Sequence, residues 1–332
     1  MPAGTQRRGL SVETVFEKRR FRPRLLDWYD RNQRDLPWRR DHDPYRVWVS
    51  EIMLQQTRVI AVLEHYRKFL RRFPTVQALA KARESSVLAA WSGLGYYRRA
   101  RMLHRAAKSV LLEHAGEFPA SAKELRGLDG IGRYTAAAIA SIAFGEVVAV
   151  VDGNVERVLE RLFGRELRGE EHWQAAEGLL SRQRPGDFNQ AMMELGATVC
   201  TPRRPKCPEC PILEFCATRG ELEKAGKRGR PKRREIGYTL NRRGGAIFLV
   251  QRPKQGSLMP GMWELPEVFA WNGKTRPWLT LRHSITETNF AVQVLRSSAP
   301  KTIEGRWVRR GQVAQLPLTG LARKILRAAK LI

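Results

Sequence analysis

Hydrophobic residues recur at helical spacing through the first two thirds of the chain. The stretch YRVWVSEIMLQQTRVIAVLEHYRKFL, which starts at Tyr45, predicts one long helix or two short ones. In ARMLHRAAKSVLLEH, one face of the predicted helix carries Leu103, Ala107, Val110 and Leu111. TAAAIASIAF predicts a buried helix of small residues, and VERVLERLF predicts a short amphipathic one. The pattern therefore predicts an all-α domain.

The pattern changes after this helical part. Residues 219–236 include RGELEKAGKRGRPKRR, which is rich in glycine and basic residues without a hydrophobic period, as is typical of a linker. Further on, GAIFLV, FAVQVL and GRWVRR predict strands, and LTGLARKILRAAKLI predicts a closing helix. We expect a basic N-terminal arm at 1–24, a helical domain at 25–218, the linker, and a smaller α+β domain at 237–332.

The composition adds a strong positive charge. The 332 residues include 60 Lys and Arg against 33 Asp and Glu, which gives a formal net charge of +27. Each cation that neutralises a phosphate releases a counterion, so this excess favours nucleic acid as the partner. No hydrophobic run approaches the roughly 18 residues of a membrane span, and the N-terminus lacks a signal-peptide pattern. We expect a cytoplasmic protein, associated with the nucleoid in a bacterium, and no membrane partner.

All four cysteines lie close together, with the spacing C-x6-C-x2-C-x5-C: Cys200, Cys207, Cys210 and Cys216. Outside an export route, such a cluster indicates a metal site rather than disulfides. A zinc ribbon usually has two C-x2-C pairs and this sequence has one, so a [4Fe–4S] cluster is favoured over zinc. We expect the loop residues Arg203, Arg204 and Lys206 to bind phosphates, with the cluster as a rigid support.

A second phosphate-binding candidate is the stretch LRGLDGIGRYTAAAIA, in which a helix ends, a turn follows at Gly130 and Gly132, and a new helix begins. Glycine lets backbone N–H groups approach a phosphate, and a helix N-terminus favours an anion. A plain helix–helix turn is the alternative. The position just before the cysteines in a basic chain favours phosphate binding.

Together these stretches resemble the helix-hairpin-helix DNA glycosylases with an iron–sulfur cluster, the endonuclease III superfamily. LPWRRDHDPYRVWVSEIMLQQTRV, GLGYYRRARMLHRAA, VVDGNVERVL and FNQAMMELGATVC are similar to adenine DNA glycosylases, which remove adenine mispaired with 8-oxoguanine. The resemblance runs from about Leu36 to Cys216 and resumes at SLMPGMWELPE. It implies an all-α glycosylase domain with an iron–sulfur loop at 200–216, then a Nudix-like α+β domain. It also implies a monomer that binds double-stranded DNA containing A:8-oxoguanine or A:G mispairs.

Base excision needs a stabilised oxocarbenium ion and a protonated leaving purine, a task that suits two carboxylates with different pKa values. Glu51 has Val47, Trp48 and Leu54 as helical neighbours, so desolvation should raise its pKa and make it the acid. A buried salt bridge is its alternative role. Asp152 precedes GNVERVLERLF and suits a helix N-cap. The resemblance makes it the carboxylate facing the sugar.

The resemblance assigns further roles near these carboxylates. It makes Asn154 a hydrogen-bonding neighbour of Asp152. In bifunctional members a lysine occupies the slot that Tyr134 fills in GIGRYTA, and a tyrosine cannot form a Schiff base. Tyr134 is then a hydroxyl that assists at the sugar, with packing behind the hairpin as the alternative, and the enzyme is expected to be monofunctional, leaving an abasic site. The family's intercalating residues match Gln56 and Tyr96.

The resemblance also implies residues that contact the two bases. Those expected to line the adenine pocket are Arg34, Leu36, Trp38 and Gln190. The family's reading loop commonly carries Phe-Ser-His, whereas the aligned segment LRHSITETNF offers Ile285, Thr286 and Glu287. We expect Thr286 to read 8-oxoguanine, with Glu287 and His283 beside it; a solvated turn is the alternative.

Two other functions compete with adenine removal. An endonuclease III-like glycosylase on oxidised pyrimidines is disfavoured by Tyr134 and by the extra domain. A non-catalytic, metal-stapled DNA-binding protein is disfavoured because both carboxylates, Glu51 and Asp152, are present.

Overall fold

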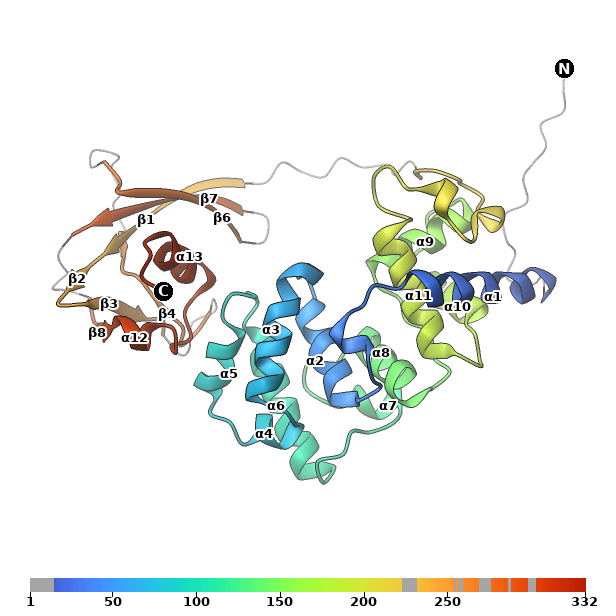
Figure 1. Ribbon diagram of the computed structural model, residues 1–332, viewed down its shortest axis with the longest axis horizontal. Coiled ribbons are helices and arrows are strands. Elements are labelled where there is room, and N and C mark those ends of the chain that lie inside the picture. The colour runs from blue at the N-terminus through green and yellow to red at the C-terminus, as the bar shows by residue number, and fades with distance from the viewer. Residues whose placement is uncertain are drawn as a thin grey trace, which may run out of the picture. The chain divides into compact units, whose positions relative to one another are not determined.

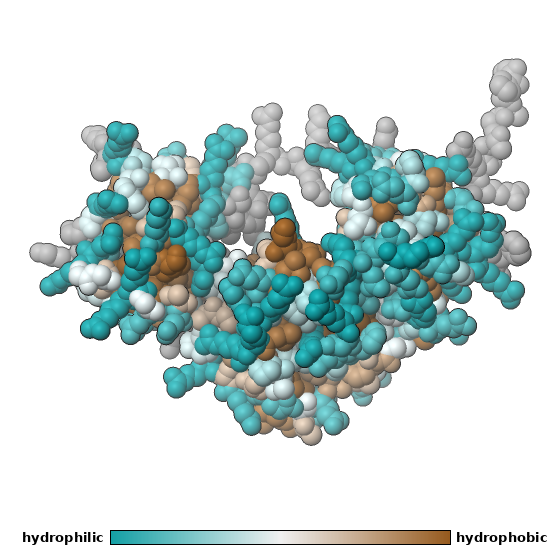
Figure 2. Space-filling model, viewed as in Figure 1, coloured by the Kyte–Doolittle hydropathy of each residue, from teal (hydrophilic) through white to brown (hydrophobic). Residues whose placement is uncertain are grey.

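The computed structural model describes residues 15–222, 232–253, 255, 259–268, 276–285, 288–297 and 303–332. Its contacts divide the chain into two compact units, Met1–Gln55 with Ser109–Gly226 and Gln56–Lys108 with Lys227–Ile332. Figure 1 labels the elements of both units. Hydrophilic side chains cover much of the face seen in Figure 2, in keeping with the charge of the chain. No helix in the described ranges combines the length and the hydrophobicity that a membrane span requires.

The described part of the first unit is helical. Its elements are α1 (Val15–Asn32), η1 (Pro37–Arg39), α2 (Pro44–Leu54), α7 (Ala122–Leu125), α8 (Arg133–Phe144), α9 (Gly153–Phe163), α10 (Glu170–Leu179), α11 (Pro185–Thr198), η2 (Cys207–Glu209) and η3 (Leu213–Phe215). Helices α1, α9, α10 and α11 bury one hydrophobic cluster, against which three of the cysteines pack. Helix α8 packs against α2, α7 and α11. The prediction of an all-α domain is confirmed here.

The second unit combines helices with two sheets. Its helices are α3 (Val59–Arg72), α4 (Val76–Ala80), α5 (Glu84–Trp91), α6 (Arg98–Glu113, which continues into the first unit), α12 (Arg310–Val313) and α13 (Gly320–Ala328). Its strands are β1 (Lys232–Leu240), β2 (Arg242–Arg243), β3 (Ala246–Gln251), β4 (Trp263–Glu264), β5 (Glu267–Val268), β6 (Leu279–Ile285), β7 (Thr288–Arg296) and β8 (Arg306–Arg309).

The two sheets share one core. One has the order β5-β1-β7-β6, with β1 and β7 parallel, and the other joins β2, β3, β4 and β8. Helix α13 lies between the sheets in Figure 1, and its Leu321, Ile325 and Leu326 are buried with residues of β1, β3, β7 and β8. The sheet-containing C-terminal part agrees with the predicted α+β class.

Several boundaries differ from those expected. Helix α1 begins at Val15, inside the predicted arm, and β1 begins at Lys232, inside the predicted linker. Strand β1 lacks a hydrophobic pattern at its start because Arg233, Arg234 and Glu235 are exposed, although the strand pairs with β7 along its length. The stretch from Tyr45 forms two helices, α2 and α3.

Helices α3 to α5 and most of α6 group with the sheets rather than with the other helices. The hydroxyls of Ser92 and Tyr97 both donate to the carbonyl of Leu318 at 2.8 Å. The side chain of Arg323, on α13, donates to Ser92 Oγ at 2.9 Å. These buried polar contacts attach the turn between α5 and α6 to the C-terminal part, and hydrophobic spacing along the sequence does not reveal them.

Candidate functional site

The first unit contains a buried carboxylate with a tyrosine hydroxyl beside it. Glu51 lies on α2 with its residue 6% exposed. The hydroxyl of Tyr134, in the first turn of α8, donates to Glu51 Oε2 at 2.7 Å. Burial raises the pKa of Glu51 to about 7; the negative charge of Asp152 adds to the rise, while the Tyr134 hydrogen bond opposes it. This carboxyl can therefore donate a proton near neutral pH.

Tyr134 remains a hydrogen-bond donor in this setting. Burial raises its pKa well above the ordinary value, and the charges of Glu51 and Asp152 add to that rise. Its oxygen also lies 3.5 Å from the sulfur of Met193, on α11. Tyr134 thus contacts Glu51 of α2, the expected acid, on one side and Met193 of α11 on the other.

Asp152 has the N-cap geometry that its sequence suggests. Its Oδ1 accepts hydrogen bonds from the backbone N–H groups of Asn154 and Val155 at 2.9 and 2.8 Å. Its Oδ2 accepts from the Asn154 side chain at 2.9 Å. Asp152 remains partly exposed, so the cap orients a carboxylate that solvent or a ligand can still reach.

Two arginines of α9 connect this carboxylate region to the cysteine loop. Arg157 donates to the carbonyl of Cys200 at 2.9 Å and to Asn154 Oδ1 at 2.9 Å. The buried Arg161 donates to Cys200 Sγ at 3.3 Å and to the carbonyl of Thr201 at 2.8 Å. The two arginines lie one helical turn apart, at i and i+4, on the helix that Asp152 caps. That spacing could have signalled them in the sequence.

The four cysteines suit an iron–sulfur group. Burial raises the pKa of the Cys210 thiol to about 12, and part of that rise comes from the Cys200, Cys207 and Cys216 thiols. N–H groups point at two of these sulfurs, from Arg161 to Cys200 and from the backbone of Arg219 to Cys216 at 3.3 Å. Hydrogen bonds of this kind accompany thiolate ligands of iron–sulfur clusters. Within the described ranges, no three His, Cys, Asp or Glu residues are grouped for a single metal ion.

The predicted phosphate-binding residues lie on exposed turns. Arg203, Arg204 and Lys206 are exposed on the cysteine loop, although Lys206 also lies 3.4 Å from Glu209. Gly130 has a φ of +76°, which glycine adopts without strain, and Gly132 is the exposed N-cap of α8. The predicted turn between two helices is therefore present, between α7 and α8, and phosphate binding by its glycines stays a prediction.

An unpredicted glutamate binds one of the expected adenine-pocket residues, Arg34. Glu194, on α11, is fully buried, and its Oε1 accepts from Arg34 Nε at 2.6 Å. Its Oε2 accepts from Arg39 Nη2 at 2.8 Å. The other predicted residues, Leu36, Trp38 and Gln190, are buried. Glu194 is the one charged residue in the stretch FNQAMMELGATVC. Because a buried carboxylate needs a charged or hydrogen-bonding partner, its position there could have marked it as a functional or structural residue.

The two expected intercalating residues lie in the second unit. Gln56 and Tyr96 are exposed and both have positive φ, of +54° and +47°. Such strained non-glycine residues cluster at functional sites. Arg99 connects their turns: it donates to Thr57 Oγ1 at 3.1 Å, and its guanidinium lies 5.4 Å from the centre of the Tyr96 ring.

Tyr96 and His283 line the same cavity of about 770 Å³. The cavity is strongly cationic, since its lining also includes Arg98, Arg101, Arg105, Arg323, Lys324 and Arg327. Of the residues expected to read the base opposite adenine, His283 thus lines the same cavity as Tyr96, an expected intercalating residue. Thr286 and Glu287 lie outside the described residues.

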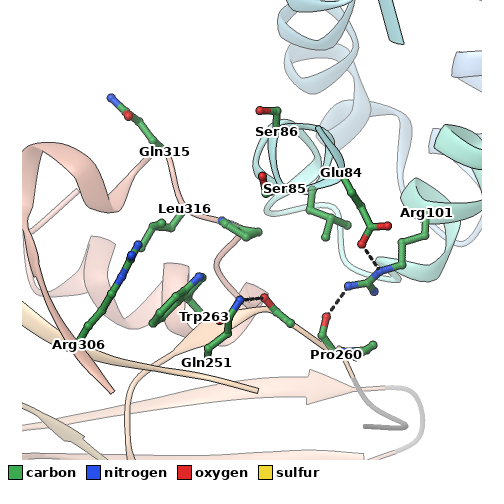
Figure 3. A pocket seen from close by; sticks show the side chains of 13 residues that line it. Glu84, Ser85, Ser86, Arg101, Gln251, Pro260, Trp263, Arg306, Gln315 and Leu316 are labelled. Atoms are coloured by element: carbon green, nitrogen blue, oxygen red, sulfur yellow. Dashed lines mark hydrogen bonds and ion pairs between the residues drawn. The ribbon is translucent and has the colours of Figure 1, made fainter. Parts of the chain in front are cut away.

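A neighbouring cavity of about 530 Å³ separates α5 from the sheet that contains β4 (Figure 3). On one side Arg101 donates to Glu84 at 3.0 Å and also to the carbonyl of Pro260. On the other side Arg306 stacks on the ring of Trp263, 4.4 Å from its centre. The Arg101 contacts attach the strand-connecting segment at Pro260 to α5 and α6.

Comparisons with known proteins agree with this geometry. Residues 49–179 match the HhH-GPD superfamily of base excision DNA repair proteins, and residues 200–216 match the iron–sulfur binding domain of endonuclease III. The second match confirms the prediction of an iron–sulfur cluster at the four cysteines.

Curated relatives confirm the resemblance to adenine DNA glycosylases. The adenine DNA glycosylase of Homo sapiens is 41% identical over 321 residues, covering 76% of this chain and 58% of that protein. That of Arabidopsis thaliana is 41% identical, covering 78% of this chain and 50% of its own length. The chain thus spans between half and two thirds of the length of these relatives.

Solved structures extend the comparison. A thermostable thymine-DNA glycosylase is 32% identical, with a TM-score of 0.59, covering 62% of this chain and 98% of its own. Endonuclease III in a non-covalent complex with DNA has a TM-score of 0.54 at 22% identity, covering 63% of this chain and 97% of its own, which indicates a shared fold.

Proposed function

Because the chain belongs to the HhH-GPD superfamily of base excision DNA repair proteins, we propose that it removes adenine mispaired with 8-oxoguanine or guanine by hydrolysing the N-glycosidic bond. The observation that carries this proposal is the buried Glu51, whose pKa of about 7 and contact with Tyr134 suit a general acid. The similarity to curated adenine DNA glycosylases supports the choice of base.

In this mechanism the Glu51 carboxyl protonates a ring nitrogen of the extruded adenine. The bond between the sugar C1′ and the base then breaks, and its electron pair leaves with the protonated base. Asp152, oriented by Asn154, faces the positive charge that develops on the sugar. Water adds its hydroxide to C1′ and loses its other proton, which leaves an abasic site.

Tyr134 occupies the position where a bifunctional relative has lysine, so no Schiff base forms and the strand stays intact. The four cysteines would hold a [4Fe–4S] cluster, which supplies a rigid support for the loop that carries Arg203, Arg204 and Lys206. The C-terminal part is proposed to be a Nudix-like domain that reads the base opposite adenine. Support comes from the cationic cavity shared by Tyr96 and His283.

The test is adenine release under single-turnover conditions from duplexes with A opposite 8-oxoguanine, G and C. We expect the order 8-oxoguanine, then G, then C, and strand breaks only after alkali treatment. Glu51→Gln should slow release by about 10²–10⁴-fold, the usual contribution of a general acid. Glu113→Gln, an exposed control with the same charge change, should not. Release at equal rates opposite all three bases, or by Glu51→Gln at the parental rate, contradicts the proposal.

A further inference from the structure

A further cavity, of about 460 Å³ and with a cationic lining, lies at one end of the strands of the second unit. Its lining includes Arg242 and Arg243 of β2 and Arg296 of β7. Strands β1 and β7 run parallel, with Leu240 opposite Arg296, so both strands end at this cavity. It shares no lining residue with the cavity of Tyr96 and His283.

The charge of this cavity is not neutralised by any residue in the described part of the chain. Arg242, Arg243 and Arg296 are exposed, and none forms an ion pair with a described residue. None of the described lining residues is acidic. Three cations gathered around one cavity repel each other, so their arrangement favours an anionic ligand that spans them.

The cavity also has fixed walls. The guanidinium of Arg296 stacks on Trp278, 4.1 Å from the ring centre, which restricts its motion. The fully buried Asn241 donates to the carbonyl and the hydroxyl of Ser297 at 2.8 and 3.1 Å. A ligand therefore meets at least one cation, Arg296, that is already positioned, which lowers the entropy cost of binding.

The strand register places this cavity away from His283. His283 pairs with Phe290, and Arg296 lies six residues further along β7. At about 3.3 Å per strand residue, the separation is about 20 Å. Nucleotides follow each other about every 3.4 Å along the DNA axis, so 20 Å corresponds to about six nucleotides.

We propose that Arg242, Arg243 and Arg296 form a second DNA-contact site, which binds backbone phosphates of the duplex about six nucleotides from the mispair. The inference rests on the proposed function, because it assumes that the base opposite adenine lies near His283. A polyanion is favoured over an acidic protein segment because the same unit carries another cavity lined by several cations, the one shared by Tyr96 and His283. A continuous phosphate backbone can contact both cavities. The net charge of +27 points the same way.

The test compares the parental protein with the triple variant Arg242→Gln, Arg243→Gln, Arg296→Gln. The matched control is Arg67→Gln, Arg71→Gln, Arg72→Gln, which removes the same charge from exposed positions on α3. Each protein is titrated against two duplexes, with about four or about twelve base pairs on each side of an A:8-oxoguanine mispair. At about 3.4 Å per nucleotide, the short duplex ends before the proposed contact site and the long duplex extends past it. Half-saturation of adenine release is measured over a range of salt concentrations.

On the long duplex, the cavity variant should need about tenfold more protein for half-saturation. The slope of log affinity against log salt should fall by up to about 2.7, or about 0.9 per lost phosphate contact. On the short duplex it should match the parent. Any of three results would overturn the proposal: an equal loss of affinity on both duplex lengths, no loss on the long duplex, or an equal loss in the control variant. If the cavity variant bound DNA like the parent, an acidic protein segment would be the better candidate for the ligand of this cavity.

A parallel measurement separates this inference from the proposed function. Binding to a long undamaged duplex is followed by fluorescence anisotropy, which needs no base release. If the parent released no adenine but the cavity variant still lost salt-dependent affinity, the proposed function would fail and the DNA-contact site would stand.

Discussion

Arg157 and Asn154 join the cysteine loop to the carboxylate site. One guanidinium donates to the carbonyl of Cys200 and to Oδ1 of Asn154, and the amide nitrogen of Asn154 in turn donates to Asp152. A change at the loop can therefore alter the orientation of the carboxylate through three hydrogen bonds.

Replacing Arg157 by Gln should slow adenine release by about 10–100-fold, the usual effect of losing a residue that orients a functional group. DNA affinity should change little, because the guanidinium of Arg157 is engaged by protein atoms, the carbonyls of Cys200 and Gly196 and Oδ1 of Asn154. Single-turnover rates and the visible absorbance of the cluster are measured together. A normal rate with intact absorbance would show that the link has no effect on the carboxylate.

Gly196 allows α11 to approach the start of α9. A Cβ added there would lie 2.6 Å from the Cβ of Asn154, which is closer than real contacts. Gly196→Ala should therefore displace Asn154 and slow adenine release about tenfold or more, since small misplacements of catalytic groups are costly. Gly311→Ala, where an added Cβ meets nothing within 4 Å, is the control. Equal rates for both variants would contradict this.

Adenine release should depend on pH through Glu51. The acid must be protonated, and its pKa is about 7. The rate should be nearly constant below this pH and fall about tenfold per pH unit above it. The single-turnover rate is measured across the pH range at saturating protein. A rate that rises through neutral pH would mean that Glu51 acts as its anion.

The same pKa implies a cost in stability. Folding raises the pKa of Glu51 from 4.5 to about 7, so between these values the folded protein holds a proton that the unfolded chain releases. The free energy of unfolding therefore falls as pH rises through this window, by about 3 kcal/mol in total. Glu51→Gln should be more stable than the parent by up to this amount at about pH 8, and equal to it near pH 4.5. Urea unfolding at both pH values checks this; a pH-independent difference would contradict it.

Glu194 balances two cations around the expected adenine pocket. Although burial opposes it, hydrogen bonds from Arg34 and Arg39 lower the pKa of Glu194, which therefore stays ionised. Glu194→Gln should destabilise the protein by about 3 kcal/mol, because Arg39 loses its charge partner in a buried site. Adding Arg39→Gln should recover part of that loss in urea unfolding. If the double variant were less stable than the single one, the charge balance would not be the cause.

Local features of the sequence were sufficient to predict several parts of this protein. Hydrophobic spacing predicted α2, α8 and α9 of the first unit, because burial of one helical face leaves a period in the sequence. The cysteine spacing predicted the iron–sulfur site, since four thiols must lie close together to hold one group. Asp152 before GNVERVL predicted an N-cap, because capping depends on the next three residues only.

Other features were decided by contacts between distant residues. Glu194 lies about 160 positions from Arg34, and Tyr134 lies 83 positions from Glu51. The grouping of α3 to α6 with the sheets depends on Ser92 and Tyr97 meeting Leu318. A buried polar group must find its partner wherever the fold brings one, and a one-dimensional pattern carries no record of that partner. The sequence alone therefore determined the elements and the chemistry available, whereas the tertiary structure decided which charges meet and which, as at Arg242 and Arg296, form no ion pair with a described residue.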